Sequence, residues 1–206
     1  MPSGAAALSD NARKHTARNP LQRWLIKRFY ATLLGLFDGL EIDSVLDAGC
    51  GEGFTLQRLA QRFAAPQLTA TDADFSALGA RSVCPPGVAR VCADITALPY
   101  RDASFDAVLA TEVLEHLAAP HAALREMQRV ARRYVICSVP HEPYFRLANL
   151  LRGKNVAAGG NDPGHIQHWS RRGFRRFVDA QLPVRRCASA FPWTLILAET
   201  ARHPTG

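Results

Sequence analysis

Apolar residues recur at helical and at strand spacing along this chain, and the two patterns alternate from residue 44 onward. Apolar positions three and four apart predict an amphipathic helix over 20–40, with Asn19 as N-cap and Pro20 at the first helical position. Further helices are predicted at 54–63, 76–83 and 120–132, and strands at 44–48, 67–71, 89–92, 105–110 and 134–139. Such alternation favours a parallel sheet with helices on both faces.

The C-terminal pattern differs, because apolar runs at 184–190 and 193–198 are separated only by a short turn with Pro192. Strands joined so tightly must be antiparallel neighbours. The predicted fold class is therefore α/β, a Rossmann-like sheet that is mostly parallel with one reversed strand near its edge. We expect one domain over 20–206, a disordered lead-in over 1–19, and a substrate-side insertion over 141–170, where the strand–helix rhythm stops.

Composition narrows the class of protein. The five cysteines show no CxxC spacing, which favours free thiols over a disulfide framework or zinc ribbon. A charged start followed by an apolar stretch is missing, as is a run of about 18 apolar residues, so we expect a cytoplasmic protein. Charge is uneven: the balance is +4 over 1–40, −4 over 41–145 and +7 over 146–186. The basic flanks suit an acidic substrate, RNA phosphates or an anionic membrane, or only a soluble surface.

Candidate chemistry lies where the predicted strands end. The sequence VLDAGCGEG (45–53) places three glycines at alternate positions between a strand and a helix. The GxGxG spacing differs from the GxGxxG that cradles a pyrophosphate. Asp72 ends the second strand, where a carboxylate can accept both hydroxyls of a ribose. Asp94 follows the third strand, where it could accept from an adenine amino group while Ile95 packs on the ring.

These segments together resemble the class I S-adenosylmethionine-dependent methyltransferases. The resemblance rests on VLDAGCGEG, TATDAD (69–74) and ADITALPYRDASFDAVLATEVLEHL (93–117), and it covers about residues 40–140. It is closest to the small single-domain, type 11-like branch. It implies a seven-stranded sheet with an antiparallel last strand, and S-adenosyl-L-methionine as the cofactor with S-adenosyl-L-homocysteine as the product.

The resemblance also implies a set of cofactor-binding residues. Asp47 and the glycines would contact the methionine end, Asp72 the ribose, Asp94 and Ile95 the adenine, and Thr111 and Glu112 the region near the sulfonium. The full predicted set is Asp47, Gly49, Cys50, Gly51, Gly53, Asp72, Ala73, Asp94, Ile95, Thr111 and Glu112. Within it, Cys50 is interpreted as a small residue that fills a tight turn and not as a nucleophile.

Substrate-side candidates follow the fourth and fifth predicted strands. Related methyltransferases place a segment like GHIQHWS (164–170) over the substrate, so His165 or His168 could deprotonate an acceptor and Trp169 could line its pocket. The alternative is that Ser170 caps the next helix and the histidines only support the loop. His116, His141 and Tyr144 are further candidates for contact with substrate. No metal site is expected, because His141, His165 and His168 lack ligand spacing and an acidic partner set.

The predicted activity is methyl transfer to a small, fairly apolar metabolite by a one-step in-line displacement without metal. The helix over 20–40 would pack on the sheet, close the active site or rest on a membrane surface. The alternative acceptor is RNA or protein, bound by the arginines of 171–186, although no RNA-binding module is recognisable and a nucleic-acid partner is not expected. A nicotinamide-dependent oxidoreductase and a catalytically silent cofactor-binding subunit are weaker interpretations. The oligomeric state is left open.

Overall fold

The computed structural model describes residues 19–63, 67–79, 82–142, 144–151, 160 and 164–200. The predicted lead-in lies outside these ranges except for Asn19, as does part of the predicted insertion.

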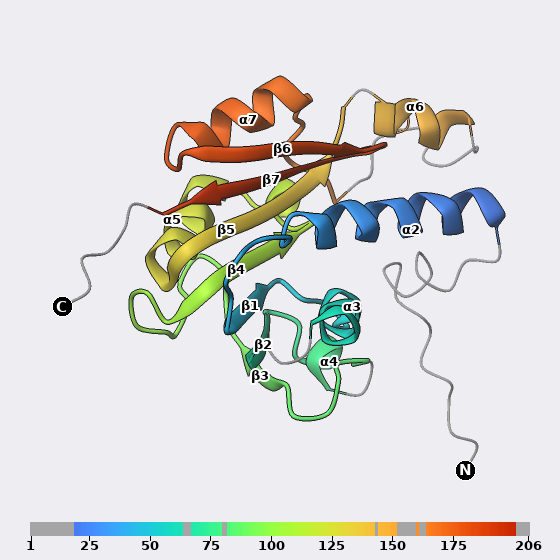
Figure 1. Ribbon diagram of the computed structural model, residues 1–206. Helices are drawn as coiled ribbons and strands as arrows, with labels where there is room; N and C mark the ends of the chain where they lie inside the picture. Colours follow the sequence, from blue (N-terminus) through green and yellow to red (C-terminus); the bar gives the residue numbers. More distant parts are fainter. Residues whose placement is uncertain are drawn as a thin grey trace, which may run out of the picture.

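A seven-stranded sheet forms the centre of the molecule, in the order β3-β2-β1-β4-β5-β7-β6 (Figure 1). β7 pairs antiparallel with β5 and β6, whereas the other neighbouring strands pair in parallel. The predicted mostly parallel sheet with one reversed strand is thereby confirmed. The strands are β1 (Ser44–Ala48), β2 (Gln67–Asp72), β3 (Ala89–Cys92), β4 (Phe105–Thr111), β5 (Ala131–Pro140), β6 (Val184–Ala190) and β7 (Trp193–Glu199).

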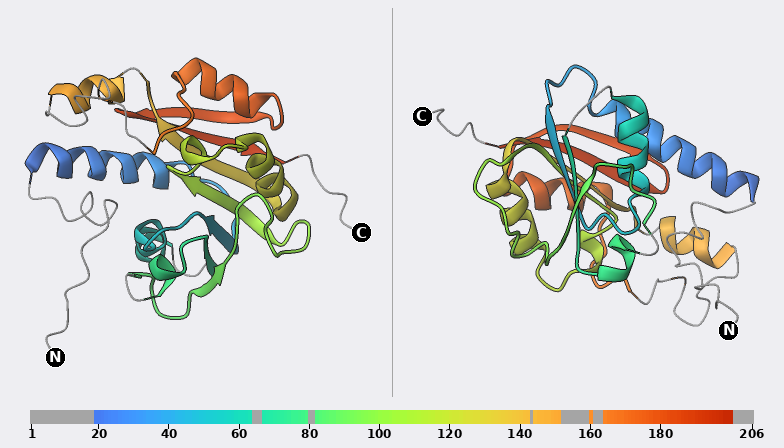
Figure 2. Two further views of the ribbon diagram at one scale, coloured as in Figure 1. Left: turned by 180° about the vertical axis from the view of Figure 1, so that it is seen from behind. Right: turned by 90° about the horizontal axis from the view of Figure 1, so that it is seen from below.

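Helices cover both faces of the sheet, because successive strand residues point to opposite sides. Val45 and Ala107 pack in the core beneath α2 (Pro20–Gly35) and α3 (Phe54–Arg62). Leu46 and Val108 pack in a second core beneath α5 (Pro120–Val130) and α7 (Arg171–Asp179). The views in Figure 2 show the resulting three layers. The remaining helices are α4 (Phe75–Leu78), the 3-10 turn η1 (Leu114–His116) and α6 (Tyr144–Leu151).

α2 begins as predicted but ends earlier. The Asn19 side chain accepts from the backbone N–H of Leu21 at 2.9 Å, which satisfies one of the unpaired donors of the first turn. The helix stops at Gly35, not at residue 40, and the chain continues as a turn. Leu36 and Phe37 are still buried there. The apolar spacing over 36–40 therefore marked burial and not helical conformation.

Two other predicted boundaries were wrong for local reasons. The short helix predicted over 76–83 is α4, which starts after the Asp74 cap and ends at Leu78, because Gly79 adopts a non-helical conformation. The helix predicted to reach residue 132 gives way to β5 at Ala131. Ala131 pairs with Phe105 of β4, so strand pairing overrides helical preference at that point.

The segment 98–102, which is the LPYRD sequence, is held by several hydrogen bonds from Arg129 and by one to Glu126. The Arg129 guanidinium donates to the carbonyls of Leu98 and Tyr100 at 2.9 and 2.7 Å, and it forms ion pairs with Asp102 and Glu126. The Tyr100 hydroxyl and the Thr71 side chain lie 2.8 Å apart, which ties this loop to the end of β2. These contacts hold the segment against the end of β2. Among the described residues, no helix is both long enough and apolar enough to cross a membrane.

Candidate functional site

A cavity of about 570 Å³ opens where β1, β2, β3 and β4 end. Open parallel sheets present their backbone ends and loops to ligands at this edge. Two walls enclose it. The strand-end wall consists of Gly49, Cys50, Gly51, Asp72, Ala73, Asp94 and Ile95. The covering wall consists of Ile26, Phe29, Tyr30, His116, Leu117 and His165, and Thr111 and Glu112 lie between the two walls.

The glycine turn forms the floor of the strand-end wall. The N–H groups of Gly49 and Cys50 both donate to the Thr71 carbonyl, at 2.7 and 3.0 Å, so the turn is fastened to β2. Gly49 has φ +79°, and a Cβ built on it would lie 2.5 Å from Cγ2 of Val113. Glycine is therefore required here both by backbone conformation and by space. Gly53, the last glycine of the turn, caps α3 and does not line the cavity.

Asp72 lines the cavity, and its carboxylate can accept more hydrogen bonds than the two that it receives from the backbone. Its Oδ2 accepts from the Gly51 N–H at 2.7 Å and its Oδ1 from the Asp74 N–H at 2.8 Å. A carboxylate offers about four acceptor positions, so about two remain for ligand hydroxyls. Asp94 lies on the same wall, where the backbone N–H and hydroxyl of Thr96 hold its Oδ1 and lower the pKa of its carboxyl. Ile95 next to it is buried and apolar.

Asp47 lies in β1 directly beneath this wall, fully buried and outside the cavity lining. Neither carboxylate oxygen has a hydrogen-bond partner among the described residues. Burial, together with the negative charge of Asp72, raises the pKa of Asp47 to about 7. Burial also raises the pKa of the Cys50 thiol far above its usual range, with Asp47 and Asp72 adding to the effect. A thiol held in its protonated form is a poor nucleophile, which agrees with a space-filling role for Cys50.

Glu112 directly follows β4 with φ +56°, a conformation that few non-glycine residues adopt. The indole N–H of Trp193, on β7, donates to its Oε1 at 2.7 Å. The Thr111 and Thr55 hydroxyls lie 3.3 Å apart across the cavity floor. The carboxylate is thus held at the junction of the two walls by a residue on a different strand.

α2 supplies the apolar part of the covering wall. Ile26, Phe29 and Tyr30 lie on one face of this helix and line the cavity. The Phe29 ring packs edge-on against Trp193, with centroids 5.2 Å apart. Burial raises the pKa of Tyr30, and its hydroxyl is hydrogen-bonded to the Thr55 side chain. Tyr30 therefore presents a neutral phenol to the cavity.

The segment 164–170 adds His165 to the covering wall, next to His116 and Leu117 of the η1 region. The backbone N–H groups of Ile166 and Gln167 both donate to the Glu115 carbonyl, at 2.8 and 2.9 Å. This contact brings the His165 ring to 4.9 Å from that of His116, across about 50 residues of chain. The Glu115 carboxylate, 1% exposed, lies within the same group: donor atoms of Glu115, His116 and His165 are all within 4.8 Å of one another. Of the predicted histidines, His116 and His165 meet at the cavity.

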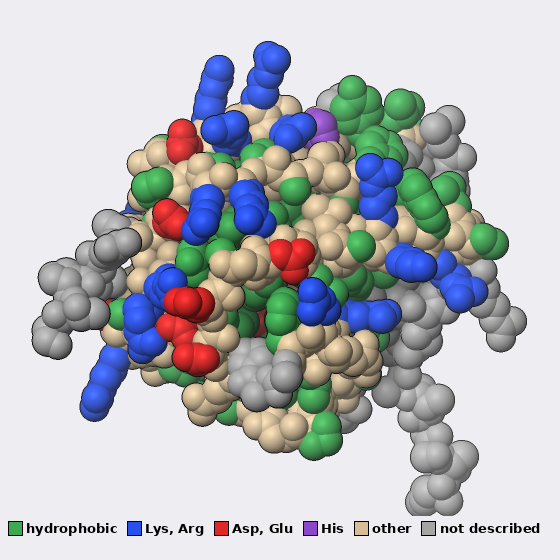
Figure 3. Space-filling model, viewed as in Figure 1, with side chains coloured by type: hydrophobic (Ala, Val, Ile, Leu, Met, Phe, Trp, Pro, Cys, Tyr) green, Lys and Arg blue, Asp and Glu red, His purple; other side chains and the backbone are tan. Residues whose placement is uncertain are grey.

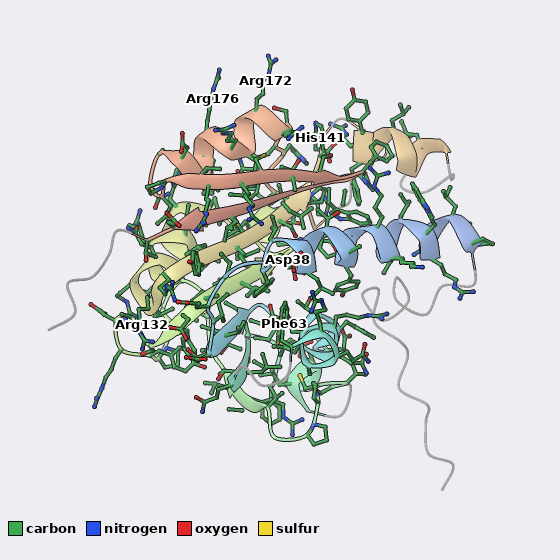
Figure 4. The ribbon with its side chains drawn as sticks, viewed as in Figure 1. Asp38, Phe63, Arg132, His141, Arg172 and Arg176 are labelled. Atoms are coloured by element: carbon green, nitrogen blue, oxygen red, sulfur yellow. The ribbon has the colours of Figure 1, made fainter. Side chains whose placement is uncertain are left out.

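The other substrate-side candidates lie elsewhere. His168 is half-exposed, 4.0 Å from Glu142, and it does not line the cavity. Trp169 packs on Phe174 and Phe177 of α7 instead. His141 lies just after the end of β5, beside α6 (Figure 4). Its ring centroid is 5.1 Å from that of Tyr144.

Several lining residues had no signal in the sequence. Phe54 and Thr55, at the start of α3, and Leu117, after η1, line the cavity, but nothing in the spacing of their neighbours distinguished them. Phe29 belonged to the predicted apolar stripe of the helix over 20–40, whereas Ile26 and Tyr30 did not, and closing an active site was only one of three interpretations of that helix. Ser170 does cap α7, accepting from the Gly173 N–H at 3.1 Å, as the alternative for that segment proposed.

Comparison with protein families matches residues 46–138 to a family described as a methyltransferase domain. This range includes the glycine turn, Asp72, Asp94, Thr111 and Glu112. It excludes α2 and the segment 164–170, so the match covers the strand-end wall but only part of the covering wall.

Comparison with individual proteins points the same way. The chain is 37% identical over 89 residues to a malonyl-[acyl-carrier protein] O-methyltransferase of Halorhodospira halophila, covering 42% of this chain and 30% of that protein. It is 38% identical over 90 residues to a demethylmenaquinone methyltransferase of Corynebacterium urealyticum, covering 44% and 37%. The match thus spans less than two thirds of the length of each relative. The fold is similar to that of magnesium protoporphyrin IX methyltransferase from Synechocystis, solved with bound S-adenosylhomocysteine (TM-score 0.61, 20% identity, 89% and 88% covered).

Proposed function

Residues 46–138 of this chain belong to the methyltransferase-domain family, and from this premise we propose that the protein transfers a methyl group from S-adenosylmethionine to a small, fairly apolar metabolite. The observation that carries the proposal is the cavity itself. It gathers nine of the eleven residues predicted to bind cofactor, all except Asp47 and Gly53, against an apolar helix that can cover an acceptor.

The strand-end wall fits the cofactor in its chemistry. The acceptor positions left on Asp72 suit the two ribose hydroxyls, and the apolar Ile95 beside the Asp94 carboxylate suits an adenine ring and its amino group. The open glycine turn leaves room for the methionine end. A fold neighbour that holds S-adenosylhomocysteine supports this assignment. S-adenosylmethionine would supply the methyl group and leave as S-adenosylhomocysteine.

Alignment is the main task left to the protein, because the sulfonium is already an excellent leaving group. Glu112 and Thr111, at the junction of the walls, would border the sulfonium, and the covering wall would hold the acceptor opposite it. Positioning of this kind can supply roughly 7–11 kcal/mol of the barrier. His165 would serve as the base for an acceptor that must lose a proton, since it lines the cavity and His168 does not.

The covering wall favours an apolar acceptor. Ile26, Phe29 and Leu117 are apolar, and Tyr30 is neutral. The two relatives are named for different acceptors, demethylmenaquinone and malonyl-[acyl-carrier protein], so the proposal of an apolar acceptor rests on the covering wall of this chain.

An apolar acceptor could be drawn from a membrane surface. The first turns of α2 expose Leu21 and Trp24 beside Arg23, Lys27 and Arg28. α6, at the same end of the molecule, exposes Tyr144, Leu147 and Leu150. Figure 3 shows hydrophobic side chains gathered over α6 and cationic ones along α2. Apolar and cationic side chains on one surface are the features of peripheral contact with anionic lipid.

The cofactor assignment is tested by titrating the full chain with S-adenosylmethionine and measuring the binding by calorimetry. Asp72→Ala should weaken binding by at least tenfold, because hydrogen bonds to a charged group contribute about 1.5–3 kcal/mol each. Asp102→Ala is the matched control, since Asp102 forms an exposed ion pair with Arg129 outside the cavity and its loss should leave the affinity unchanged. Equal affinity of the Asp72 variant and the wild type would remove the ribose role.

The acceptor class is tested by incubating the protein with methyl-labelled S-adenosylmethionine and a cell extract, and then separating organic-extractable, small polar, RNA and protein fractions. We expect label in the organic fraction. Label confined to RNA or protein would favour the alternative acceptor, with recognition by the arginines of α7. Arg172 and Arg176 project from that helix away from the body (Figure 4).

A further inference from the structure

We propose that Glu115, His116 and His165 form a binding site for one divalent transition-metal ion, such as Zn²⁺ or Mn²⁺, on the substrate side of the cavity. The proposal departs from the expectation of a metal-free site. It rests on the proposed function only for the role of the ion, and not for its binding.

The donor set is the first argument. Two imidazoles and one carboxylate offer ligand atoms that lie within 4.8 Å of one another. Imidazole and carboxylate together suit borderline ions such as Zn²⁺, and two histidines with one glutamate is a known three-ligand set of catalytic zinc sites. In a tetrahedral site with bonds of about 2.0–2.1 Å, ligand atoms lie roughly 3.3 Å apart. Side-chain rotations would therefore have to draw the three groups together by up to about 1.5 Å.

The orientation of His116 is the second argument. Its Nδ1 lies 2.7 Å from the Gly164 carbonyl oxygen, which can only accept a hydrogen bond. Nδ1 must therefore carry the proton, and in the neutral ring Nε2 is left with a lone pair. A backbone carbonyl is one of the usual partners, with carboxylates and water, that orient a metal-binding histidine through its second nitrogen.

The local framework is the third argument. Glu115 and His165 are both buried, at 1% and 6% exposed. The two N–H bonds from Ile166 and Gln167 to the Glu115 carbonyl fix the loop that carries His165 against η1. The His116 side chain is exposed, but its hydrogen bond to the Gly164 carbonyl ties it to the segment that carries His165. The three groups thus come from two segments joined by hydrogen bonds.

The site faces the cavity. His116 and His165 line it, and three protein ligands leave at least one coordination position open toward the same space. An ion there would bind an oxygen of the methyl acceptor and lower the pKa of a bound hydroxyl. With the ion bound, His165 would be a ligand and would not act as the base. The hydroxyl proton would pass to water, the oxygen would bond to the methyl carbon, and the carbon–sulfur bond would break with its electron pair left on sulfur. The acceptor class that follows is a hydroxyl compound.

The test is a titration of the EDTA-treated full chain with Co²⁺, monitored by visible absorption. A second titration adds Zn²⁺ as a competitor, and both are carried out without methyl donor. We expect one equivalent to bind. Glu115→Gln, His116→Asn and His165→Asn should each weaken binding by more than tenfold, since loss of even a second-shell partner costs about 10–100-fold. The matched control is His121→Asn, because His121 is exposed on α5, where it contacts Gln181 and Phe177. It should bind like the wild type.

A second measurement avoids dependence on the folding of the variants. In the wild-type chain, Co²⁺ should shift or broaden the imidazole NMR signals of His116 and His165 and leave those of His121 unchanged. Binding that persists in all three variants, or that perturbs His121 equally, would overturn the proposal, as would absence of binding to the wild type. Titration with S-adenosylmethionine on the same samples separates this outcome from failure of the proposed function, because either ligand can bind without the other.

Discussion

The two walls of the cavity are built in different ways. The strand-end wall consists of turns that directly follow β1, β2 and β3, and its shape is set by nearby backbone, as in the bonds from Gly49 and Cys50 to the Thr71 carbonyl. The covering wall consists of α2, η1 and the segment 164–170, which are far apart in sequence. It is held by tertiary contacts such as Phe29 on Trp193.

The family match follows the same division between the two walls. The family match over 46–138 contains the whole strand-end wall but leaves out α2 and 164–170. A strand-end wall made from local turns can be kept while the covering wall changes, so on the proposed function acceptor choice should reside in the covering wall. Each prediction below perturbs one wall and asks whether the other responds.

The largest expected effect is on the attachment of α2. Phe29→Ala should lower the free energy of unfolding by about 3–5 kcal/mol, because a buried aromatic ring is replaced by a cavity between α2 and β7. The measurement is urea denaturation followed by circular dichroism. Leu21→Ala on the same helix is the control; Leu21 is 60% exposed, so its loss should cost less than about 0.5 kcal/mol. A small effect at Phe29 would mean that the covering wall is not anchored by this contact.

The next effect concerns the glycine turn. Gly49→Ala should lower the free energy of unfolding by about 2–4 kcal/mol, combining about 1–2 kcal/mol of left-handed backbone strain with overlap against Val113. Gly87→Ala is the matched control, since Gly87 has φ +84° and nothing within 4 Å of the added Cβ. It should show the strain alone. Equal costs at the two positions would show that Val113 yields, and that space does not require glycine in the turn.

The two walls also differ in how much of their structure could be predicted from the sequence. The strand-end wall was predictable because each of its residues ends a strand or follows one within three residues, and the apolar run of each strand is local; β1 and β3 have the predicted bounds. The meeting of His165 with His116 was not predictable, because it depends on backbone bonds between 164–170 and η1, which no periodicity encodes. The bond from Trp193 to Glu112 was hidden for the same reason. α2 was predicted as a helix, but its place over the cavity depends on packing against β7.

Asp47 allows a test of the strand-end wall through pH. Its native pKa of about 7 lies above the ordinary value of about 3.9, so between these pH values the folded chain holds a proton that the unfolded chain has lost. Stability from this group is therefore fully present at low pH and is lost as pH rises through 7. Between pH 6 and 8 the free energy of unfolding should fall by about 1.4 kcal/mol from Asp47 alone.

Asp47→Asn should remove that slope, as measured by urea denaturation at both pH values. Asp43→Asn is the comparison, because Asp43 is exposed and lies just before β1. The slope should persist in it. Equal slopes in the wild type and in Asp47→Asn would contradict this expectation. The Asp47 carboxyl would then already be ionised, and an interaction with the strand-end wall would have to offset the cost of burying its charge.

The smallest expected effect is on membrane contact by the outer end of the covering wall. Lys27→Gln should leave stability within about 0.5 kcal/mol, because Lys27 is exposed, but lower binding to anionic vesicles by about fivefold, since each cation near such a surface contributes about 1 kcal/mol. The measurement is sedimentation with vesicles of phosphatidylserine and phosphatidylcholine. Arg125→Gln carries the same charge change on α5, which covers the opposite face of the sheet, and should have no effect. Equal losses in the two variants would show that net charge alone governs binding. In that case α2 would serve only to cover the cavity, and the acceptor would reach it from solution.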